Sequence, residues 1–157
     1  SATRWGTGAA LVMYLIPFWD WLPTIATHQY YCAKEAGFWI YKTPEQWKKE
    51  NPGVTETLVA QLSIQRMAYG ELQIMDQRFA IETRHSTPVL LIPTEIAERL
   101  LIDRKTGDIL AKTVEVGSGV GNMATGGGLK FWLNQSPCIS TDFWELTSAI
   151  ETMRGQK

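Results

Sequence analysis

The sequence has little net charge, two histidines and only two cysteines. Its fifteen basic side chains are matched by sixteen acidic ones, which leaves a net charge of −1 at pH 7. A dedicated nucleic-acid-binding protein normally carries a clear excess of basic residues, so this balance argues against nucleic acid as a partner. Hydrophobic residues make up 45% of the chain, a share typical of a folded domain, which argues against wholesale disorder.

The sequence also lacks a recognisable catalytic motif. The glycine-rich stretch 117–128 is followed by neither Lys-Ser/Thr nor a helix start, as a phosphate-binding loop would require, so we expect a connection between strands there. Ser118 lies in Gly-Ser-Gly rather than in the Gly-x-Ser-x-Gly pattern of a hydrolase nucleophile. We therefore predict no catalytic residues and no cofactor, and favour a protein without catalysis of its own. The enzyme alternative is a thiol- or histidine-dependent hydrolase that combines His85 with a cysteine or a carboxylate.

An apolar, aromatic-rich segment opens the chain. Trp5–Ala26 has 22 residues with a single charged side chain, Asp20. About 20 apolar residues are enough for a helix to cross the hydrocarbon core of a bilayer. Arg4 precedes the segment, as the positive-inside rule expects where the N-terminal side is cytoplasmic. We therefore predict a membrane anchor over residues 1–26, in which Pro23 ends the helix.

Aromatic residues mark the far end of this segment, and tryptophan rings favour the headgroup zone of a bilayer. Asp20 between them would be costly inside lipid, so we expect its carboxylate at the boundary, where it can reach water or cap the next turn. The functional alternative is a contact with a basic residue of a neighbouring subunit. The sequence thus predicts a membrane-interface or partner contact formed by Phe18, Trp19, Asp20 and Trp21.

Two alternatives for this segment stay open. The order of a basic residue, an apolar run and the small residues Ile25-Ala26-Thr27 loosely fits a secretory signal sequence. The strictly apolar run Gly8–Trp19 has only 12 residues, a length that also suits a buried helix in a soluble globular domain. The retention of the segment in this chain favours the anchor over a cleaved signal sequence.

Residues 27–157 are predicted to form one soluble α+β domain, an antiparallel sheet with flanking helices. Apolar and polar residues alternate over 78–84, and the turn Asp103–Asp108 between two apolar runs predicts a hairpin over 97–116. Thr43-Pro44-Glu45-Gln46 is typical of a capped helix start. The other expected elements are a strand over 38–41, a helix over 55–67, a strand over 89–92, and a C-terminal helix capped by 140–142 with Phe143, Leu146, Ile150 and Met153 on its inner stripe.

The two cysteines, Cys32 and Cys138, lie far apart in the sequence. In an oxidising compartment a disulfide between them would close a long loop and contribute about 4 to 5 kcal/mol, whereas in the cytosol they would be two free thiols. His28 lies four residues before Cys32, so the two could share a helix face and ligate a metal. The spacing supplies no further ligands, and we therefore predict the disulfide and no metal site.

Several segments resemble an uncharacterised group of small bacterial single-span membrane-anchored proteins. The segments that carry the resemblance are Trp19–Pro23, His28–Cys32, Gly37–Thr43 with Trp47, Asp103–Asp108 with the following Val-Gly-Ser-Gly, and Lys130–Leu133. The group has no assigned activity. The resemblance implies an anchored, exported domain and says nothing about chemistry.

These observations together predict a protein of the bacterial inner membrane whose C-terminal domain is periplasmic. Its expected function is that of a binding or accessory subunit in a larger membrane assembly. Its expected partners are other membrane protein subunits and, through residues 5–26, the bilayer itself. The alternatives are the hydrolase-type enzyme and a soluble globular domain with an apolar first helix.

Overall fold

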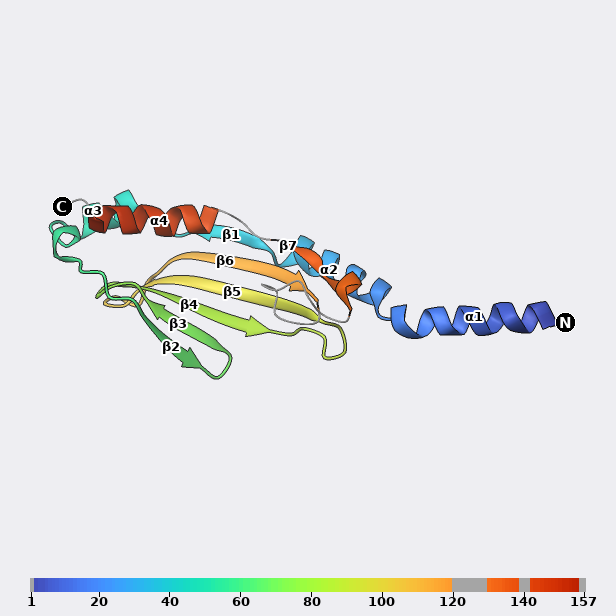
Figure 1. Ribbon diagram of the computed structural model, residues 1–157. Helices are drawn as coiled ribbons and strands as arrows, with labels where there is room; N and C mark the ends of the chain where they lie inside the picture. Colours follow the sequence, from blue (N-terminus) through green and yellow to red (C-terminus); the bar gives the residue numbers. More distant parts are fainter. Residues whose placement is uncertain (1, 120–129, 139–141, 156–157) are drawn as a thin grey trace.

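The computed structural model describes residues 2–119, 130–138 and 142–155. Within them the helices are α1 (Ala2–Phe18), α2 (Trp21–Lys34), α3 (Pro44–Glu50) and α4 (Asp142–Gly155), with the short 3-10 turns η1 (Thr55–Thr57) and η2 (Phe131–Leu133). The strands are β1 (Gly37–Ile40), β2 (Ser63–Met67), β3 (Gly70–Ile74), β4 (Phe79–Ser86), β5 (Thr94–Asp103), β6 (Ile109–Ser118) and β7 (Gln135–Cys138). The fold is α+β, with an antiparallel sheet and flanking helices, as the sequence predicts (Figure 1).

The seven described strands form one sheet in the order β1-β6-β5-β4-β3-β2, and β7 also pairs with β6. The strands β2 to β6 pair in sequence order as antiparallel neighbours. The outer edge of β6 is shared, because β1 pairs with residues 111–114 and β7 pairs with Val116 and Ser118. β1 from the N-terminal part of the chain and β7 from the C-terminal part therefore lie along the same edge of β6.

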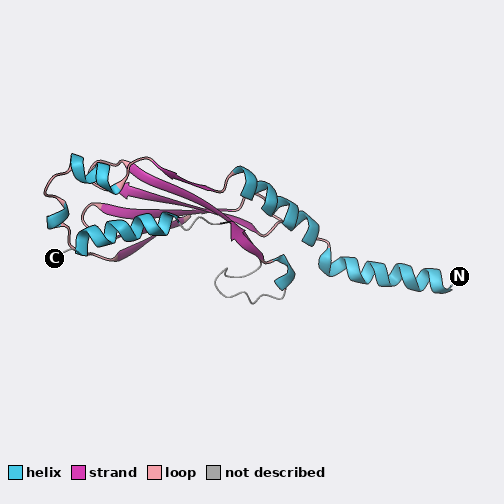
Figure 2. Cartoon of the chain, turned by 90° about the horizontal axis from the view of Figure 1, so that it is seen from above, coloured by secondary structure: helices cyan, strands magenta, loops and turns pink. Residues whose placement is uncertain are grey.

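Helices cover the two faces of the sheet at different ends. Successive side chains of a strand point to opposite faces. Ala111 of β6 belongs to the hydrophobic core together with Phe143 of α4. Val116, five residues further on, faces the other side, and it is paired with Cys138, whose side chain is bonded to Cys32 of α2. Figure 2 accordingly shows α4 and α2 towards opposite ends of the sheet.

The hydrophobic core lies under α3 and α4. Trp47 of α3 is 2% exposed and packs against Phe79 of β4, with ring centroids 4.7 Å apart. The inner stripe predicted for the C-terminal helix is confirmed for Phe143, Leu146 and Ile150, all of which are buried, whereas the side chain of Met153 lies outside the described residues.

Local signals at α3 and at the β5–β6 turn act as the sequence predicts. Thr43 Oγ1 accepts a hydrogen bond from the Gln46 amide, and Gln46 Oε1 accepts one from the Thr43 amide, which completes the capping box. Gly107 has a φ of +78°, the left-handed conformation that glycine adopts without strain, at the turn between β5 and β6. The predicted hairpin over 97–116 is confirmed.

Two predicted elements are wrong. The helix expected over 55–67 is replaced by η1 and by β2, which pairs with β3. Leu58 and Leu62 have the spacing of one helical face, but Leu58 is buried and Leu62 is 73% exposed, so pairing between strands overrides the local pattern. The strand expected over 89–92 is a turn, in which the Ile92 amide donates to the Val89 carbonyl. The flanking Pro88 and Pro93 have no amide hydrogen for a ladder.

Candidate functional site

The first helix, α1, stands clear of the sheet (Figures 1 and 2). Along it, Trp5, Met13 and Ile16 are 81%, 77% and 67% exposed. One helical stretch of the described residues, Arg4–Lys34, is long and apolar enough to cross a membrane, and 12% of its most apolar window is buried. α1 is therefore not a core helix of this domain. Its length and composition suit the predicted anchor and also an N-terminal signal sequence.

A break separates α1 from α2 at Trp19 and Asp20. Pro23 does not end a helix there, which corrects the prediction. It is the third residue of α2, where a missing amide hydrogen removes no helical hydrogen bond. Phe18 is half-buried and Asp20 and Thr24 are both buried, so packing against the domain begins at the end of α1. The predicted division after residue 26 therefore falls inside α2.

The buried face of α2 is polar. Asp20, Thr24, His28 and Cys32 follow each other at intervals of four residues, which places them along one side of a helix. The first three are 6%, 0% and 6% exposed, and α2 contacts β5, β6, β7 and η2. Buried polar groups are costly unless they find partners. The partners of these side chains therefore show which contacts hold α2 against the domain.

Asp20 finds its partner within the chain. Its Oδ2 lies 2.5 Å from Lys130 Nζ, and the carboxylate side chain is 8% exposed. The structure thus brings to Asp20 a basic residue of its own chain, whereas the sequence indicated water or the cap of the next turn, with a basic residue of a neighbouring subunit as the alternative. The Asp20 side chain makes no cap hydrogen bond to α2. Phe18 also faces its own chain, because its ring lies 4.8 Å from that of Trp132 in η2. Of the four residues predicted at the membrane interface, Trp19 and Trp21 remain 60% and 42% exposed.

A disulfide joins α2 to β7. Cys32 and Cys138 are 106 residues apart in sequence and are bonded, with their Cα atoms 5.8 Å apart. The structure thus contains the predicted bridge. It fastens the helix that follows α1 to the last described strand of the sheet, so that α2 cannot leave the sheet without reduction of this bond.

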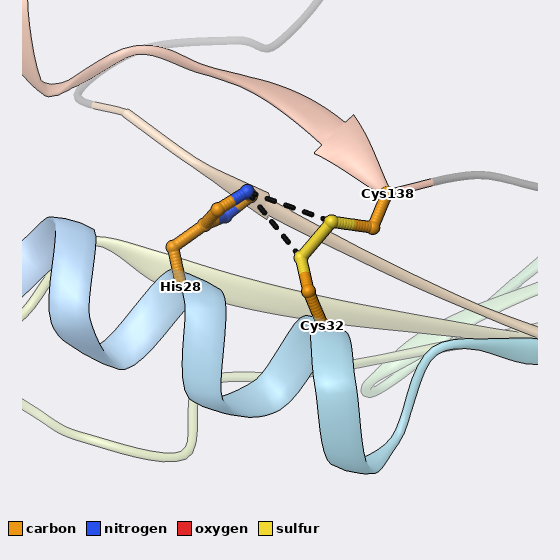
Figure 3. The surroundings of a disulfide bond; sticks show 3 residues. All are labelled: His28, Cys32 and Cys138. Carbon is orange, nitrogen blue, oxygen red and sulfur yellow. Dashed lines mark hydrogen bonds between the residues drawn. A yellow bond between two sulfur atoms is a disulfide. The ribbon is translucent and has the colours of Figure 1, made fainter.

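His28 lies directly against both sulfurs (Figure 3). Its Nε2 is 3.4 Å from Cys32 Sγ and 3.7 Å from Cys138 Sγ. Since a disulfide sulfur carries no proton, Nε2–H is the donor in these contacts. Burial lowers the pKa of His28 below its ordinary value, and the Ser136 backbone partly opposes this shift. Burial of this imidazole on α2 therefore favours its neutral form.

These three side chains form a group with metal-ligand chemistry. The ligand atoms of His28, Cys32 and Cys138 all lie within 4.8 Å of one another. The sequence pointed to His28 and Cys32 through their spacing, but nothing in the sequence placed the same histidine beside Cys138. We call these residues the His–Cys–Cys centre.

The other histidine, His85, belongs to a separate site. It is paired with Ala97 on β5, which places it on the same sheet face as Ala111 and opposite the face of the disulfide. The combination of His85 with a cysteine is therefore not formed. The combination with a carboxylate is formed, because His85 Nδ1 and Glu95 Oε1 lie 2.6 Å apart beside an open depression of about 700 Å³. Both side chains are exposed, at 45% and 39%, so water reaches the pair freely.

No family model matches the chain, and neither a curated protein nor a solved structure matches it. The resemblance described above therefore rests on the quoted segments alone.

Proposed function

We propose that this chain is a membrane-anchored binding protein, in which α1 lies in the bilayer and the sheet domain acts as an accessory subunit of a larger membrane assembly. The observation that carries this proposal is α1 itself, an apolar helix that projects from the domain with its side chains exposed. Exposed apolar area of this extent has a high free-energy cost in water, and a bilayer removes that cost.

The loop between β4 and β5 also supports contact between a membrane and the α1 end of the domain. Residues 87–93 carry no charge, and Leu90 and Leu91 are 93% and 78% exposed. The Pro93 carbonyl at the end of this loop accepts a hydrogen bond from the Gly119 amide. The neighbouring Ser118 Oγ donates to the carbonyl of Leu133 in η2, which contacts α2. The loop therefore lies at the α1 end of the sheet (Figure 1). Two exposed apolar features thus occur at one end of the molecule, as a membrane surface would require.

The outward face of α2 supports a protein partner. Leu22 and Tyr30 are 68% and 56% exposed, while the buried polar residues Thr24 and His28 of this helix face the sheet. An exposed apolar face beside an anchor suits contact with another membrane subunit. The disulfide supports a periplasmic domain, since disulfides persist in oxidising compartments.

Membrane extraction tests the anchor. Membranes from bacteria that produce the full chain are washed with alkaline carbonate and then extracted with mild detergent. We expect the protein to stay in the membrane during the wash and to dissolve in detergent. The double variant Leu11→Arg/Leu15→Arg should move to the soluble fraction, because each arginine costs about 2.5 to 3.5 kcal/mol near the centre of a span. Leu62→Arg, at a residue 73% exposed on the domain, is the matched control and should stay.

Two results would contradict the proposal. Release of the wild-type chain by carbonate would exclude α1 as an anchor. A detergent extract of native membranes in which the chain migrates only as a lone monomer would exclude the accessory-subunit role and leave the anchor intact.

A further inference from the structure

We propose that the His–Cys–Cys centre is a redox-gated metal site, which holds a disulfide when oxidised and binds one thiophilic ion, Zn²⁺ or Cu⁺, when reduced. The proposal does not depend on the membrane function, because it uses only residues of α2 and β7.

A metal site of this kind fixes three distances between ligand atoms, two from nitrogen to sulfur and one between the sulfurs. The two nitrogen–sulfur distances in the centre already have suitable values. Zinc lies about 2.0–2.1 Å from an imidazole nitrogen and about 2.3 Å from a thiolate, so a tetrahedral site separates nitrogen and sulfur by about 3.5 Å. His28 Nε2 lies 3.4 Å and 3.7 Å from the two sulfurs. Only the two sulfurs have to move, from a bond to a separation of about 3.8 Å, and reduction permits that movement.

The chemistry balances without a further reactant in the protein. A dithiol reductant transfers two hydrogen atoms to the bridge, so the sulfur–sulfur bond breaks, Cys32 and Cys138 become thiols, and the reductant becomes a disulfide. An ion then displaces the two thiol protons and binds both thiolates and His28 Nε2, whose proton moves to Nδ1 of the same neutral ring. Thiolates and imidazole together select soft or borderline ions such as Cu⁺ and Zn²⁺ over Mg²⁺ or Ca²⁺.

The scaffold holds the ligands as a metal site requires. His28 and Cys32 lie one turn apart on α2, and Cys138 ends β7, which is fixed to β6 through the Val116 pairing. His28 is 6% exposed and the cysteines are half-buried. Among the described residues the group has three members, which leaves a coordination position open. Open positions are typical of ions that react or are transferred, whereas structural zinc sites are closed.

Metal titration of the full chain in detergent tests the proposal. The protein is reduced with an immobilised dithiol, separated from it, and titrated with Zn²⁺ against a chromophoric indicator and with Cu⁺ against a competing chelator. We expect one ion per reduced chain and none per oxidised chain. His28→Ala should weaken binding of the preferred ion by at least about tenfold, since one of three ligands is lost. His85→Ala is the matched control, because His85 lies on the opposite sheet face, and should bind as the wild type does.

Each other outcome overturns the proposal. These outcomes are equal binding by the oxidised chain, unchanged binding by His28→Ala, and no binding of either ion by a reduced chain that keeps its circular dichroism spectrum. If reduction unfolds the domain, the proposal requires that Zn²⁺ or Cu⁺ restores the spectrum. A spectrum that neither ion restores counts against it.

Discussion

At the scale of single residues, a buried carboxylate connects the sheet to α3. Asp103, 1% exposed at the end of β5, accepts hydrogen bonds from Trp47 Nε1 at 2.8 Å and from Arg78 Nη2 at 2.5 Å. Arg78 also lies over the Trp47 ring, with its guanidinium carbon 5.2 Å from the ring centroid. A buried ion pair of this kind is costly to break, because the remaining charge has no partner.

Asp103→Asn is therefore expected to destabilise the domain by about 3 to 5 kcal/mol, since it removes the carboxylate that pairs with the buried Arg78 guanidinium and leaves only the weaker attraction of Asp76. Denaturant unfolding in detergent, followed by tryptophan fluorescence, measures the change. Asp108→Asn, at a side chain 54% exposed in the neighbouring turn, is the control and should stay within about 0.5 kcal/mol of the wild type. Similar values for the two variants would contradict this role of Asp103.

The same pair predicts a pH dependence. Burial by itself would raise the pKa of Asp103, but the hydrogen bonds from Arg78 and Trp47 outweigh it and hold the pKa below its ordinary value. The carboxylate then stabilises the fold fully above its unfolded-state pKa of about 4. This stabilisation is lost as the pH falls through the lower folded-state pKa. The gap in unfolding free energy between wild type and Asp103→Asn should thus stay constant above about pH 5 and narrow below about pH 4. A difference in unfolding free energy that stays constant down to pH 2 would contradict this prediction.

At the scale of elements, α2 is held to the sheet mainly by polar and covalent contacts. The Asp20–Lys130 pair holds its start, and the disulfide holds its last turn. Leu22 and Tyr30 on its outward side are exposed. Such a helix couples α1 to the domain and leaves these two side chains in contact with solvent.

Lys130→Ala is expected to loosen the start of α2, because it leaves the buried Asp20 carboxylate without its cation. The unfolding free energy should fall by about 1 to 3 kcal/mol, a value reduced by the 36% exposure of Lys130. Hydrogen exchange read by mass spectrometry should show faster exchange in residues 24–28. Lys34→Ala removes the exposed pair with Glu35 and serves as the control, with the stability and the α2 exchange of the wild type. Unchanged exchange in α2 of the Lys130 variant would show that the pair does not hold it.

At the scale of the whole molecule, two exposed apolar features occur at the same end. α1 and the 87–93 loop lie there, whereas α3, α4 and the β5–β6 turn lie at the other end (Figure 1). This arrangement suits a domain that contacts a membrane at its α1 end, with its hydrophobic core away from the lipid.

A depth measurement tests this orientation. The full chain, with its native disulfide intact, is labelled with an environment-sensitive fluorophore at Leu90→Cys and placed in lipid nanodiscs. We expect a blue-shifted emission that spin-labelled lipids quench. The same label at Thr106→Cys, in the exposed turn at the far end, should report water and resist quenching. Equal quenching at the two positions, or none at Leu90, would contradict a membrane-facing loop.

Much of the fold follows from short-range signals in the sequence. The capping box at Thr43, the turn glycine at Gly107 and the apolar stripe of α4 each act within a few residues, and each prediction drawn from them is confirmed. The helix expected over 55–67 is wrong because its pattern is ambiguous over such a short stretch. The pairing of β2 with β3, a contact between segments, decides the outcome there.

The sequence by itself determined an apolar first helix, an antiparallel α+β domain behind it and two cysteines able to pair. Only the tertiary structure decided which side chains meet. It brought His28 to Cys138 and Asp20 to Lys130, each pair 110 residues apart in the chain. A local sequence pattern cannot indicate contacts between residues so far apart in the chain, because these contacts arise from the packing of α2 across β6, β7 and η2. The candidate metal chemistry of this protein is a product of that packing, whereas its apolar segment is visible in the residues alone.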